Sequence, residues 1–341
     1  MSDFPAEDAD EERPLISLIV MAYDQERYVR EAVAGALAQT WTPLEILLSD
    51  DCSPDGTFRI MEEMAAAYEG PHRIVLNRNP ENLGLVAHMN RCMDLTSGEL
   101  IVAAAGDDIS EPGRVARLAE PWLADRETVH LVHSAVREID DDGGPGEIRR
   151  PPAAITDPPD PDPLTVVRER ANCIGGSAAY DRRVVARLGP LPRSVHVEDG
   201  LLFFRACALG RVCFIDEPLL RYRTSGVSAK AASRSPGYDV LLGDRIKFIS
   251  WRVGNARGFL ADMAHLDFPG KAACTAEADR TIARFGFEAD MAGASRGERW
   301  RALPRALRHG LATRSRSRVA TVLKYLMPRL YILYYDRFCS G

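Results

Sequence analysis

Three acidic pairs in this sequence combine a residue type with a position that favours chemistry at one shared site. Asp50-Asp51 and Asp107-Asp108 each follow a short apolar run, and Glu198-Asp199 begins an apolar stretch with helical spacing. Unit charges 4 Å apart repel by about 1 kcal/mol in water, and by more when partly buried. A site that gathers these carboxylates therefore needs a cation, and their hard oxygen atoms suit Mg²⁺ or Mn²⁺ shared with substrate phosphates.

Each pair also has a purely structural explanation. Acidic residues after strands often form turns or cap helices, and Glu198-Asp199 would favour a helix N-terminus through the helix dipole. The two pairs that both lie just past strands favour a functional interpretation when they are taken together. Tyr23-Asp24, which follows the first apolar run, is a further candidate at the same kind of position.

The elements that must position these residues alternate between strand and helix. The first apolar run, Leu15 to Met21, has the length and β-branched content of a strand buried on both faces of a parallel sheet. The alternation predicts an α/β layer with a mostly parallel sheet, whose ligands bind beyond the carboxyl ends of the strands. We expect strands at 15–21, 44–48, 73–76, 100–104 and 129–136, and helices at 26–39, 55–68, 85–95 and 113–124.

The second half of the chain has a different composition. Residues 140–163 are expected to form a loop or linker, because they hold a glycine-rich turn at 140–146 and six prolines between 151 and 163. An apolar-rich stretch at 164–222 follows, with Gly175-Gly176 and a helix at about 199–209. Residues 238–290 have helical spacing, and from Arg296 onward there are eleven basic residues and two acidic ones.

Charge and absent motifs exclude several classes of protein. The 341 residues carry a net charge of −6, so nucleic acid is not expected as a partner. No GxGxxG follows the first strand, and no P-loop, GxSxG or HExxH motif is present. Residues 1–13 are acidic and lack the features of a secretory signal, and no apolar run is long enough to cross a bilayer. We therefore expect a cytoplasmic protein.

Several ordered motifs run through the first two-thirds of the chain. They are Ser17 to Asp24, Gln39-Thr40-Trp41, Leu44-Glu45-Ile46, Ser49 to Thr57, Asn79 to Gly84, Ser97 to Leu100, Gly106-Asp107-Asp108 with Pro112 and Arg114, Gly175-Gly176-Ser177, and Glu198-Asp199. Together they resemble family 2 glycosyltransferases, which have the GT-A fold, a Rossmann-like, mostly parallel sheet flanked by helices. The resemblance covers residues 14–228 and implies a GT-A domain there. Composition predicts a disordered acidic tail at 1–13, and helical spacing predicts a helical C-terminal region at 229–341 with a basic amphipathic end.

The resemblance implies a role for each matching residue. Asp108 would bind Mn²⁺ or Mg²⁺, which stabilises the leaving diphosphate, and Asp199 would be the general base that deprotonates the acceptor hydroxyl. Attack opposite the leaving group would invert the anomeric carbon. Tyr23 would stack near the base of the nucleotide, and Asp51 would hydrogen-bond to the base. Asp107 would contact the ribose or the nucleotide, and Gly84 would also contribute to nucleotide binding.

The sequence departs from the family in two places. Family members often carry Tyr-Arg-x-His, whereas Tyr222 to Ser225 contains no His, so no metal ligand is assigned there. The QxxRW motif of processive enzymes is absent, which favours an enzyme that adds one sugar or a few to a glycan or a lipid-linked acceptor. Two other interpretations stay open. One is a non-catalytic nucleotide-sugar-binding scaffold, and the other is a sugar nucleotidyltransferase, which is expected to carry a glycine-rich, basic loop after the first strand.

The end of the chain is a basic amphipathic segment. Between 316 and 338, apolar residues recur at near-helical spacing, with arginines beside them and four tyrosines interleaved. Such a helix either lies on an anionic membrane, at the inner face of the plasma membrane, or packs on its own domain or on a second copy in a homodimer. Deleting 314–341 and measuring liposome flotation distinguishes these alternatives, because unchanged flotation excludes the membrane contact.

Overall fold

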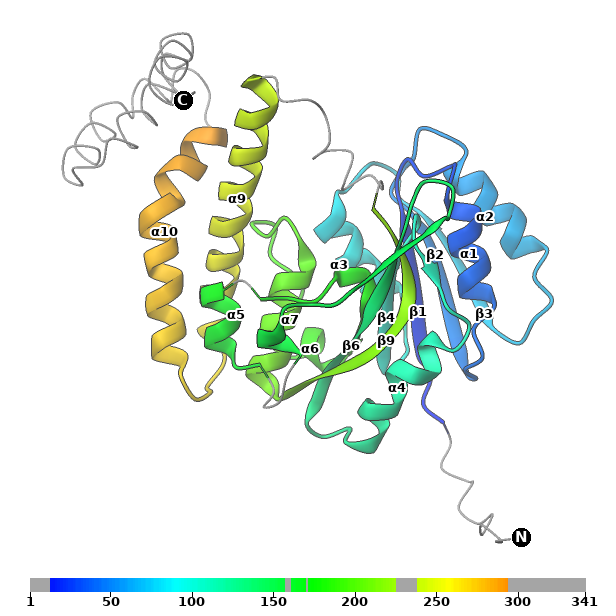
Figure 1. Cartoon of the computed structure of the whole chain (residues 1–341), viewed down its shortest axis with the longest axis horizontal. Helices are drawn as coiled ribbons and strands as arrows, with labels where there is room; N and C mark the ends of the chain where they lie inside the picture. Colours follow the sequence, from blue (N-terminus) through cyan, green and yellow to red (C-terminus); the bar gives the residue numbers. More distant parts are fainter. Residues whose placement is uncertain (1–12, 157–160, 170, 225–237, 294–341) are drawn as a thin grey trace, which may run out of the picture.

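A mixed β-sheet runs through the centre of the molecule (Figure 1). The computed structural model describes residues 13–156, 161–169, 171–224 and 238–293. Within them the sheet has nine strands in the order β3-β2-β1-β4-β8-β6-β9-β5, and β7 pairs with β6 outside this path. The strands are β1 (Ile16–Ala22), β2 (Leu44–Asp50), β3 (Arg73–Arg78), β4 (Leu100–Ala105), β5 (Ile109–Ser110), β6 (Val129–Ile139), β7 (Pro145–Arg149), β8 (Ala178–Asp181) and β9 (Arg211–Arg223).

The parallel half of the sheet agrees with the sequence prediction. β1 pairs in parallel with β2 and β4, and β2 pairs in parallel with β3. Residues 16–20 of β1 are fully buried, as expected for a strand covered on both faces. The five predicted strands correspond to β1, β2, β3, β4 and β6, and the four predicted helices to α1 (Val29–Leu37), α2 (Thr57–Ala66), α3 (Leu85–Leu95) and α4 (Arg114–Ala124). The predicted α/β fold is confirmed.

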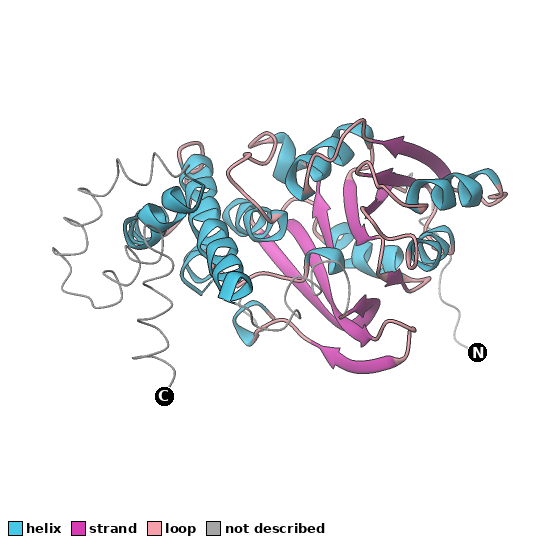
Figure 2. Cartoon of the chain, turned by 90° about the horizontal axis from the view of Figure 1, so that it is seen from above, coloured by secondary structure: helices cyan, strands magenta, loops and turns pink. Residues whose placement is uncertain are grey.

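Helices cover both faces of the sheet, as Figure 2 shows from above. Val20 of β1 belongs to a buried cluster with Val33 of α1 and Leu118 of α4. Ile19 points to the opposite face, because side chains alternate along a strand, and it belongs to a second buried cluster. That cluster includes Phe203 of α7 (Glu198–Leu209), the helix expected at about 199–209. Packing from both sides fixes the strands, so the loops that follow them start from a rigid frame.

The prediction that residues 140–163 form only a loop is wrong in part. The N–H of Asp140 donates to the carbonyl of Gly144 at 3.1 Å, and this turn leads into β7, which pairs with β6 in an antiparallel hairpin. Glycine and proline in and beside β7 are typical of loops, so the sequence does not predict this strand. Its stability comes from pairing with β6 rather than from its own sequence. The described residues that follow form a 3₁₀ turn (Ala153–Ile155) and α5 (Pro163–Glu169). Further along the described chain are a 3₁₀ turn at Gly175–Ser177 and the short helix α6 (Arg183–Ala186).

Two long helices pack beside the sheet at its α7 side (Figure 1). The region expected to be helical at 238–290 forms α9 (Tyr238–Met263) and α10 (Lys271–Gly293), which are separated by a turn where Gly270 has a φ of 83°. Phe259 of α9 and Cys274 of α10 join the buried cluster that contains α7. Arg205 of α7 and Asp262 of α9 form a buried ion pair at 2.7 Å. The helical C-terminal part therefore shares a core with the sheet.

Three expectations fall on residues outside the described part of the chain. They concern the acidic tail, of which only Arg13 is described, the boundary between 228 and 229, and the basic segment at 316–338. Among the helices that the structure describes, none combines the length and the apolar character needed to span a bilayer.

Candidate active site

The loops after β1, β2 and β4 meet at the carboxyl edge of the sheet. The N–H of Asp51 donates to the carbonyl of Ala22 at 2.9 Å, and the N–H of Gly106 donates to the carbonyl of Met21 at 2.8 Å. A Cβ on Gly106 would lie 2.6 Å from the Cβ of Ala22, so a residue with a side chain would prevent this close approach. The two loops that carry the acidic pairs are therefore held against the end of β1.

Asp51 is fixed by three hydrogen bonds and keeps room for one more. Its carboxylate accepts from Nδ2 of Asn79 at 2.8 Å and from the N–H groups of Leu83 and Gly84 at 2.9 Å each. Gly84 presents its N–H from a backbone with a φ of 77°, a conformation that favours glycine. Because a carboxylate has about four acceptor positions, one position of Asp51 is left for an N–H group of a ligand.

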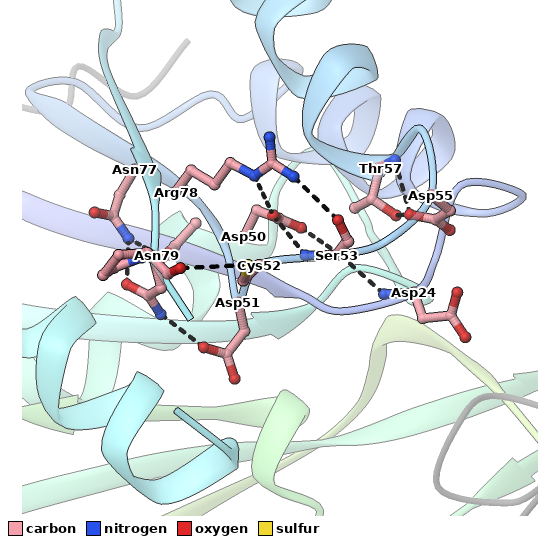
Figure 3. A network of polar contacts seen from close by, with 12 residues as sticks. Asp24, Asp50, Asp51, Cys52, Ser53, Asp55, Thr57, Asn77, Arg78 and Asn79 are labelled. Carbon is pink, nitrogen blue, oxygen red and sulfur yellow. Dashed lines mark hydrogen bonds and ion pairs between the residues drawn. The ribbon is translucent and has the colours of Figure 1, made fainter. Parts of the chain in front are cut away.

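Asp50 has a structural environment that differs from that of Asp51. Its carboxylate accepts from the N–H of Ser53 at 2.9 Å and lies 3.5 Å from Nε of Arg78. Figure 3 shows the two carboxylates pointing in different directions, with Asp50 facing Ser53 and Arg78, and Asp51 facing Asn79. Asp50 is fully buried and holds the loop together, whereas Asp51 faces the loop that contains Gly84.

Tyr23 is an exposed aromatic residue at the same edge, with 38% of its surface accessible. The next residue, Asp24, has a φ of 56°, and its N–H donates to Oγ of Ser53 at 3.0 Å. The chain therefore turns directly after Tyr23 and is fixed to the loop that carries Asp51. An exposed ring in this position can stack on a flat, aromatic ligand.

The second acidic pair is buried and is fixed to the end of β9. Oδ1 of Asp108 accepts from the N–H of Arg223 at 2.9 Å, and Nε of Arg223 donates to the carbonyl of Asp107 at 3.0 Å. The buried guanidinium of Arg223 also pairs with Glu31 at 2.8 Å and lies 4.5 Å from the ring of Tyr28. Arg223 therefore joins β9 to an acidic pair that lies 115 residues earlier in the chain.

Asp108 lies where its negative charge is unfavourable. Burial raises the pKa of its carboxyl to about 8 together with the charge of Asp107, while the N–H of Arg223 and the charges of Arg114 and Arg223 oppose the rise. Arg114 is itself fully buried and donates to the carbonyl of Gly176. A divalent cation bound to Asp108 would favour the ionised carboxylate.

The donor set at Asp108 fits a metal ion that takes most of its ligands from the substrate. Over residues 13–156, 161–169, 171–224 and 238–293, no three His, Cys, Asp or Glu side chains are gathered as a metal site. Mg²⁺ usually binds one or two protein carboxylates and completes its shell with water and substrate phosphates. A single buried carboxylate beside a second acidic residue suits this mode of binding.

Glu198 and Asp199 form the first turn of α7, and both carboxyls have raised pKa values. Removal from water raises the pKa of the half-buried Asp199 to about 6, opposed by hydrogen bonds from the N–H of Gly200, at 2.6 Å, and from the side chain of Asn172. Burial and the charge of Asp199 raise the pKa of Glu198 to about 8, and its Oε2 has no hydrogen-bond partner among the described residues. Because the pKa of Glu198 is raised further, Asp199 is the more readily ionised of the two and the better suited to accept a proton.

Gly175 and Gly176 lie between the two acidic regions. A Cβ on Gly175 would lie 3.2 Å from Oε1 of Glu198 and 3.3 Å from the Cβ of Asp199. A Cβ on the next residue, Gly176, would lie 3.2 Å from Oδ2 of Asp108. Two consecutive glycines therefore adjoin Asp108 on one side and the first turn of α7 on the other, and a side chain at either position would crowd these acidic residues.

Tyr222 of β9 responds to both acidic regions. Burial raises the pKa of its phenol, and the charges of Asp108, Asp107 and Asp199 raise it further, whereas the charge of Arg149 lowers it. One half-buried residue therefore feels carboxylates that come from β4 and from α7. The phenol of Tyr222 therefore lies within range of the charges of both acidic regions.

The structure brings the predicted site residues into two connected groups. Tyr23, Asp51 and Gly84 lie in the loops after β1, β2 and β3, beside the loop that carries Asp107 and Asp108. Asp199 lies across the glycine pair from Asp108. Their roles in binding and catalysis stay predictions.

Sequence reasoning missed the contribution of β9. Tyr222 and Arg223 were noted only as a stretch without His, yet both contact or respond to the acidic pair at Asp107-Asp108. Asn172, which bonds to Asp199, was also missed. The sequence offered one signal for Arg223, which is its position as a charged residue at the end of a β-rich run. A charged side chain is rarely buried unless it is paired, so this position could have indicated a partner of opposite charge.

The architecture defines the class of the protein as a GT-A fold. The chain superposes on S. aureus TarS 1-349 in complex with UDP-GlcNAc with a TM-score of 0.54 and 16% identity, over 94% of this chain and 87% of that one. The mannosyltransferase PcManGT from Pyrobaculum calidifontis, in complex with GDP-Man and Mn²⁺, gives a TM-score of 0.50 and 20% identity, over 97% of this chain and 89% of that one. At these identities the likeness concerns the fold alone.

Sequence comparison identifies the family. Residues 17–189, just over half of the chain, match the model of glycosyl transferase family 2, and the chain belongs to this family. EpsE of Bacillus subtilis (strain 168), which is named as a glycosyltransferase, is 38% identical over 104 residues, or 30% of this chain and 37% of its own length. The chain thus spans well under half the length of the curated relatives it matches.

Proposed function

We propose that the protein is a metal-dependent, inverting glycosyltransferase that moves a sugar from a nucleotide-diphosphate donor to a hydroxyl of a glycan or lipid-linked acceptor. One observation carries this proposal, which is that Gly175-Gly176 adjoins Asp108 on one side and the Asp199 region on the other. A donor whose diphosphate binds at Asp108 would present its sugar to a carboxylate that can accept a proton. Membership of family 2 supports the same activity.

The nucleotide of the donor would bind along the loops after β1 and β2. Tyr23 offers an exposed ring for the base, and Asp51 keeps one acceptor position for an N–H group of the base. Gly84 supports this recognition through its N–H, which holds the Asp51 carboxylate in place. Asp107, at the neighbouring strand end, would contact the ribose or another part of the nucleotide.

Asp108 would hold a Mn²⁺ or Mg²⁺ ion. When bound, such an ion stabilises the negative charge that develops on the leaving nucleoside diphosphate. The raised pKa of Asp108 and its proximity to Asp107 support a cation at this position. PcManGT, which shares the fold, is described with GDP-Man and Mn²⁺, and this supports the proposal only as an analogy of fold.

Asp199 would act as the general base. The acceptor oxygen forms a bond to the anomeric carbon, and its proton passes to Asp199. At the same time the bond between the anomeric carbon and the diphosphate oxygen breaks, and the electron pair leaves with the nucleoside diphosphate. Attack from the face opposite the leaving group inverts the anomeric carbon. Because the pKa of Glu198 is raised further than that of Asp199, Asp199 is the carboxylate of the pair that ionises first.

A thermal-shift screen of nucleotide sugars with and without Mn²⁺ tests the proposal. A ligand at 100 times its Kd stabilises the folded state by about 2.7 kcal/mol, so we expect at least one donor to raise the melting temperature only when Mn²⁺ is present. Asp108→Ala should abolish the Mn²⁺-dependent part of the shift. The donor found in this way is then incubated with Mn²⁺ and no acceptor. Binding without any release of nucleoside diphosphate, there or with an acceptor panel, would favour a non-catalytic scaffold.

A further inference from the structure

Asp199 also lines a cavity on the side of the long C-terminal helices. The cavity has a volume of about 360 Å³ and is bordered by residues of α5, the first turn of α7, α9 and α10. Figure 1 shows these four helices grouped on one side of the sheet. Asn172, which bonds to Asp199, lies in its wall as well. Whatever occupies this cavity therefore lies directly beside the carboxylate that we assign as the base.

Most of the wall of this cavity is apolar. Val166 and Val167 of α5 and Phe259 of α9 form buried parts of it. Phe248 and Trp251, three residues apart on α9, complete it with side chains that are each 45% exposed. Residues three apart on a helix lie on the same face, so the two aromatic rings present one apolar surface to solvent. Exposed aromatic groups beside a concave site are typical of ligand contact.

Phe248 belongs to an ordered arrangement of side chains on α9 and α10. The guanidinium of Arg252 lies 5.6 Å from the ring of Phe248 and 4.4 Å from the ring of Phe285 on α10. These contacts hold the rings in defined positions although Phe248 faces solvent. The aromatic surface is therefore prepared in advance, which reduces the conformational entropy lost when a ligand binds.

A few polar groups lie on the Asp199 side of the cavity. Asn255 of α9 approaches α7 so closely that its Nδ2 lies 2.9 Å from the position of a Cβ on Gly200. Its Oδ1 is buried and has no hydrogen-bond partner among the residues that the structure describes. A buried acceptor without a partner is unfavourable, so Asn255 offers a site for a donor group such as a hydroxyl. The cavity thus combines a small polar region near Asp199 with a larger apolar wall.

We propose that this cavity is the acceptor site and that the acceptor is amphipathic, with its reacting hydroxyl at Asp199 and an apolar body against Val166, Val167, Phe248 and Trp251. This inference rests on the proposed function, because it takes Asp199 as the base. A purely carbohydrate acceptor suits the cavity less well. Its many hydroxyls would lose water against the apolar wall and find few partners there, which is unfavourable for each unpaired group.

A series of alkyl β-D-glucosides, from methyl to octyl and each below its micelle concentration, tests the inference. Binding to the full chain is measured by calorimetry without any nucleotide sugar. Each methylene that enters an apolar site should lower the Kd roughly fourfold, so the expected result is a steady fall in Kd as the alkyl chain grows. A Kd that does not change with chain length would overturn the inference. It would mean that a purely polar acceptor, a segment of this chain or a second copy occupies the cavity.

Matched variants locate the effect. Phe248→Ala and Trp251→Ala remove half-exposed side chains, so they should fold normally and reduce the dependence of Kd on chain length. Leu123→Ala removes an apolar side chain that is 36% exposed on α4, far from the cavity in the fold, and should leave that dependence unchanged. An equal effect of all three variants would contradict the assignment to this cavity.

Nucleotide binding separates the two proposals. The Mn²⁺-dependent thermal shift with a nucleotide sugar should be the same in wild type, Phe248→Ala and Trp251→Ala. A normal nucleotide shift with no dependence on alkyl length overturns only the acceptor inference. A clear dependence on alkyl length without any nucleotide shift contradicts the proposed glycosyl transfer while it supports the apolar site.

Discussion

The protonation of Asp199 gives the most detailed prediction. Its pKa is raised to about 6 because its carboxyl is partly removed from water, and the base must be ionised to accept a proton from the acceptor. Activity should therefore be lost as the pH falls through 6. Activity falls towards acidic pH because protonation neutralises a carboxylate. A raised pKa means that this protonation occurs at a higher pH than in a free aspartate.

The size of the effect follows from that pKa. A carboxyl with a pKa of about 6 is roughly 90% ionised at pH 7 and roughly 10% ionised at pH 5, so kcat/KM should fall about tenfold between these values. Asp199→Asn removes the base and should lower kcat by about 10²- to 10⁴-fold. What activity remains in that variant should no longer show the acidic decline, because the group that titrates is absent.

The assay is the release of nucleoside diphosphate at saturating Mn²⁺ between pH 5 and 9. Glu198→Gln is the matched control, because the pKa of Glu198 is raised further than that of Asp199, to about 8, and glutamine has a similar shape and no charge. This variant should retain kcat within a few-fold and should keep the decline near pH 6. Donor binding by Asp199→Asn, measured by thermal shift, should stay close to wild type.

Two results would refute this reasoning. Near wild-type turnover of Asp199→Asn would show that another group takes the proton. A decline near pH 6 that persists in Asp199→Asn but is lost in Glu198→Gln would show that Glu198, and not Asp199, is the group that titrates.

Three further predictions concern the frame around the site. Asp51→Ala leaves the amide of Asn79 and two backbone N–H groups without their acceptor, so it should lower the free energy of unfolding by about 1–3 kcal/mol. The same variant should no longer bind the nucleotide. A melting curve and a binding assay that both match wild type would contradict the role of Asp51. Gly176→Ala crowds Oδ2 of Asp108 and should weaken Mn²⁺-dependent donor binding. Gly175→Ala crowds the first turn of α7 and should lower kcat while donor binding is kept. The same kinetic defect in both variants would argue against two separate regions. Asp262→Ala leaves the buried guanidinium of Arg205 unpaired and should lower the free energy of unfolding by about 3–5 kcal/mol in urea denaturation, and a loss below 1 kcal/mol would mean that α9 is not packed on α7 as described.

Local sequence patterns were sufficient to predict the parallel half of the fold. In the run from Leu15 to Met21, burial and sequence agree at Ile16, Leu18, Ile19 and Val20, which are apolar and fully buried because both faces of β1 are covered. The acidic pairs could be placed at strand ends for the same reason. Pairing was less predictable where a strand depends on its partner, as for β7, whose glycine and proline neighbours indicated a loop.

Contacts between distant parts of the chain could not be predicted. The bond between Arg223 and Asp108 joins residues 115 positions apart, and nothing in the local sequence of either one specifies the other. The turn that divides α9 from α10 at Gly270 was missed because both sides have helical spacing. The apolar cavity beside Asp199 was missed for a similar reason, since Phe248 and Trp251 fit the pattern of an ordinary packed helix until the structure shows them half exposed.

A structure of the protein with Mn²⁺ and the nucleoside diphosphate selected by the thermal-shift screen tests the central claim most directly. The account predicts the base against Tyr23, with an N–H group at the spare position of Asp51, and a metal ion bound to Asp108 and to both phosphates. The terminal phosphate should point past Gly175-Gly176 towards Asp199. A nucleotide bound elsewhere, or a metal ion held without Asp108, would contradict it.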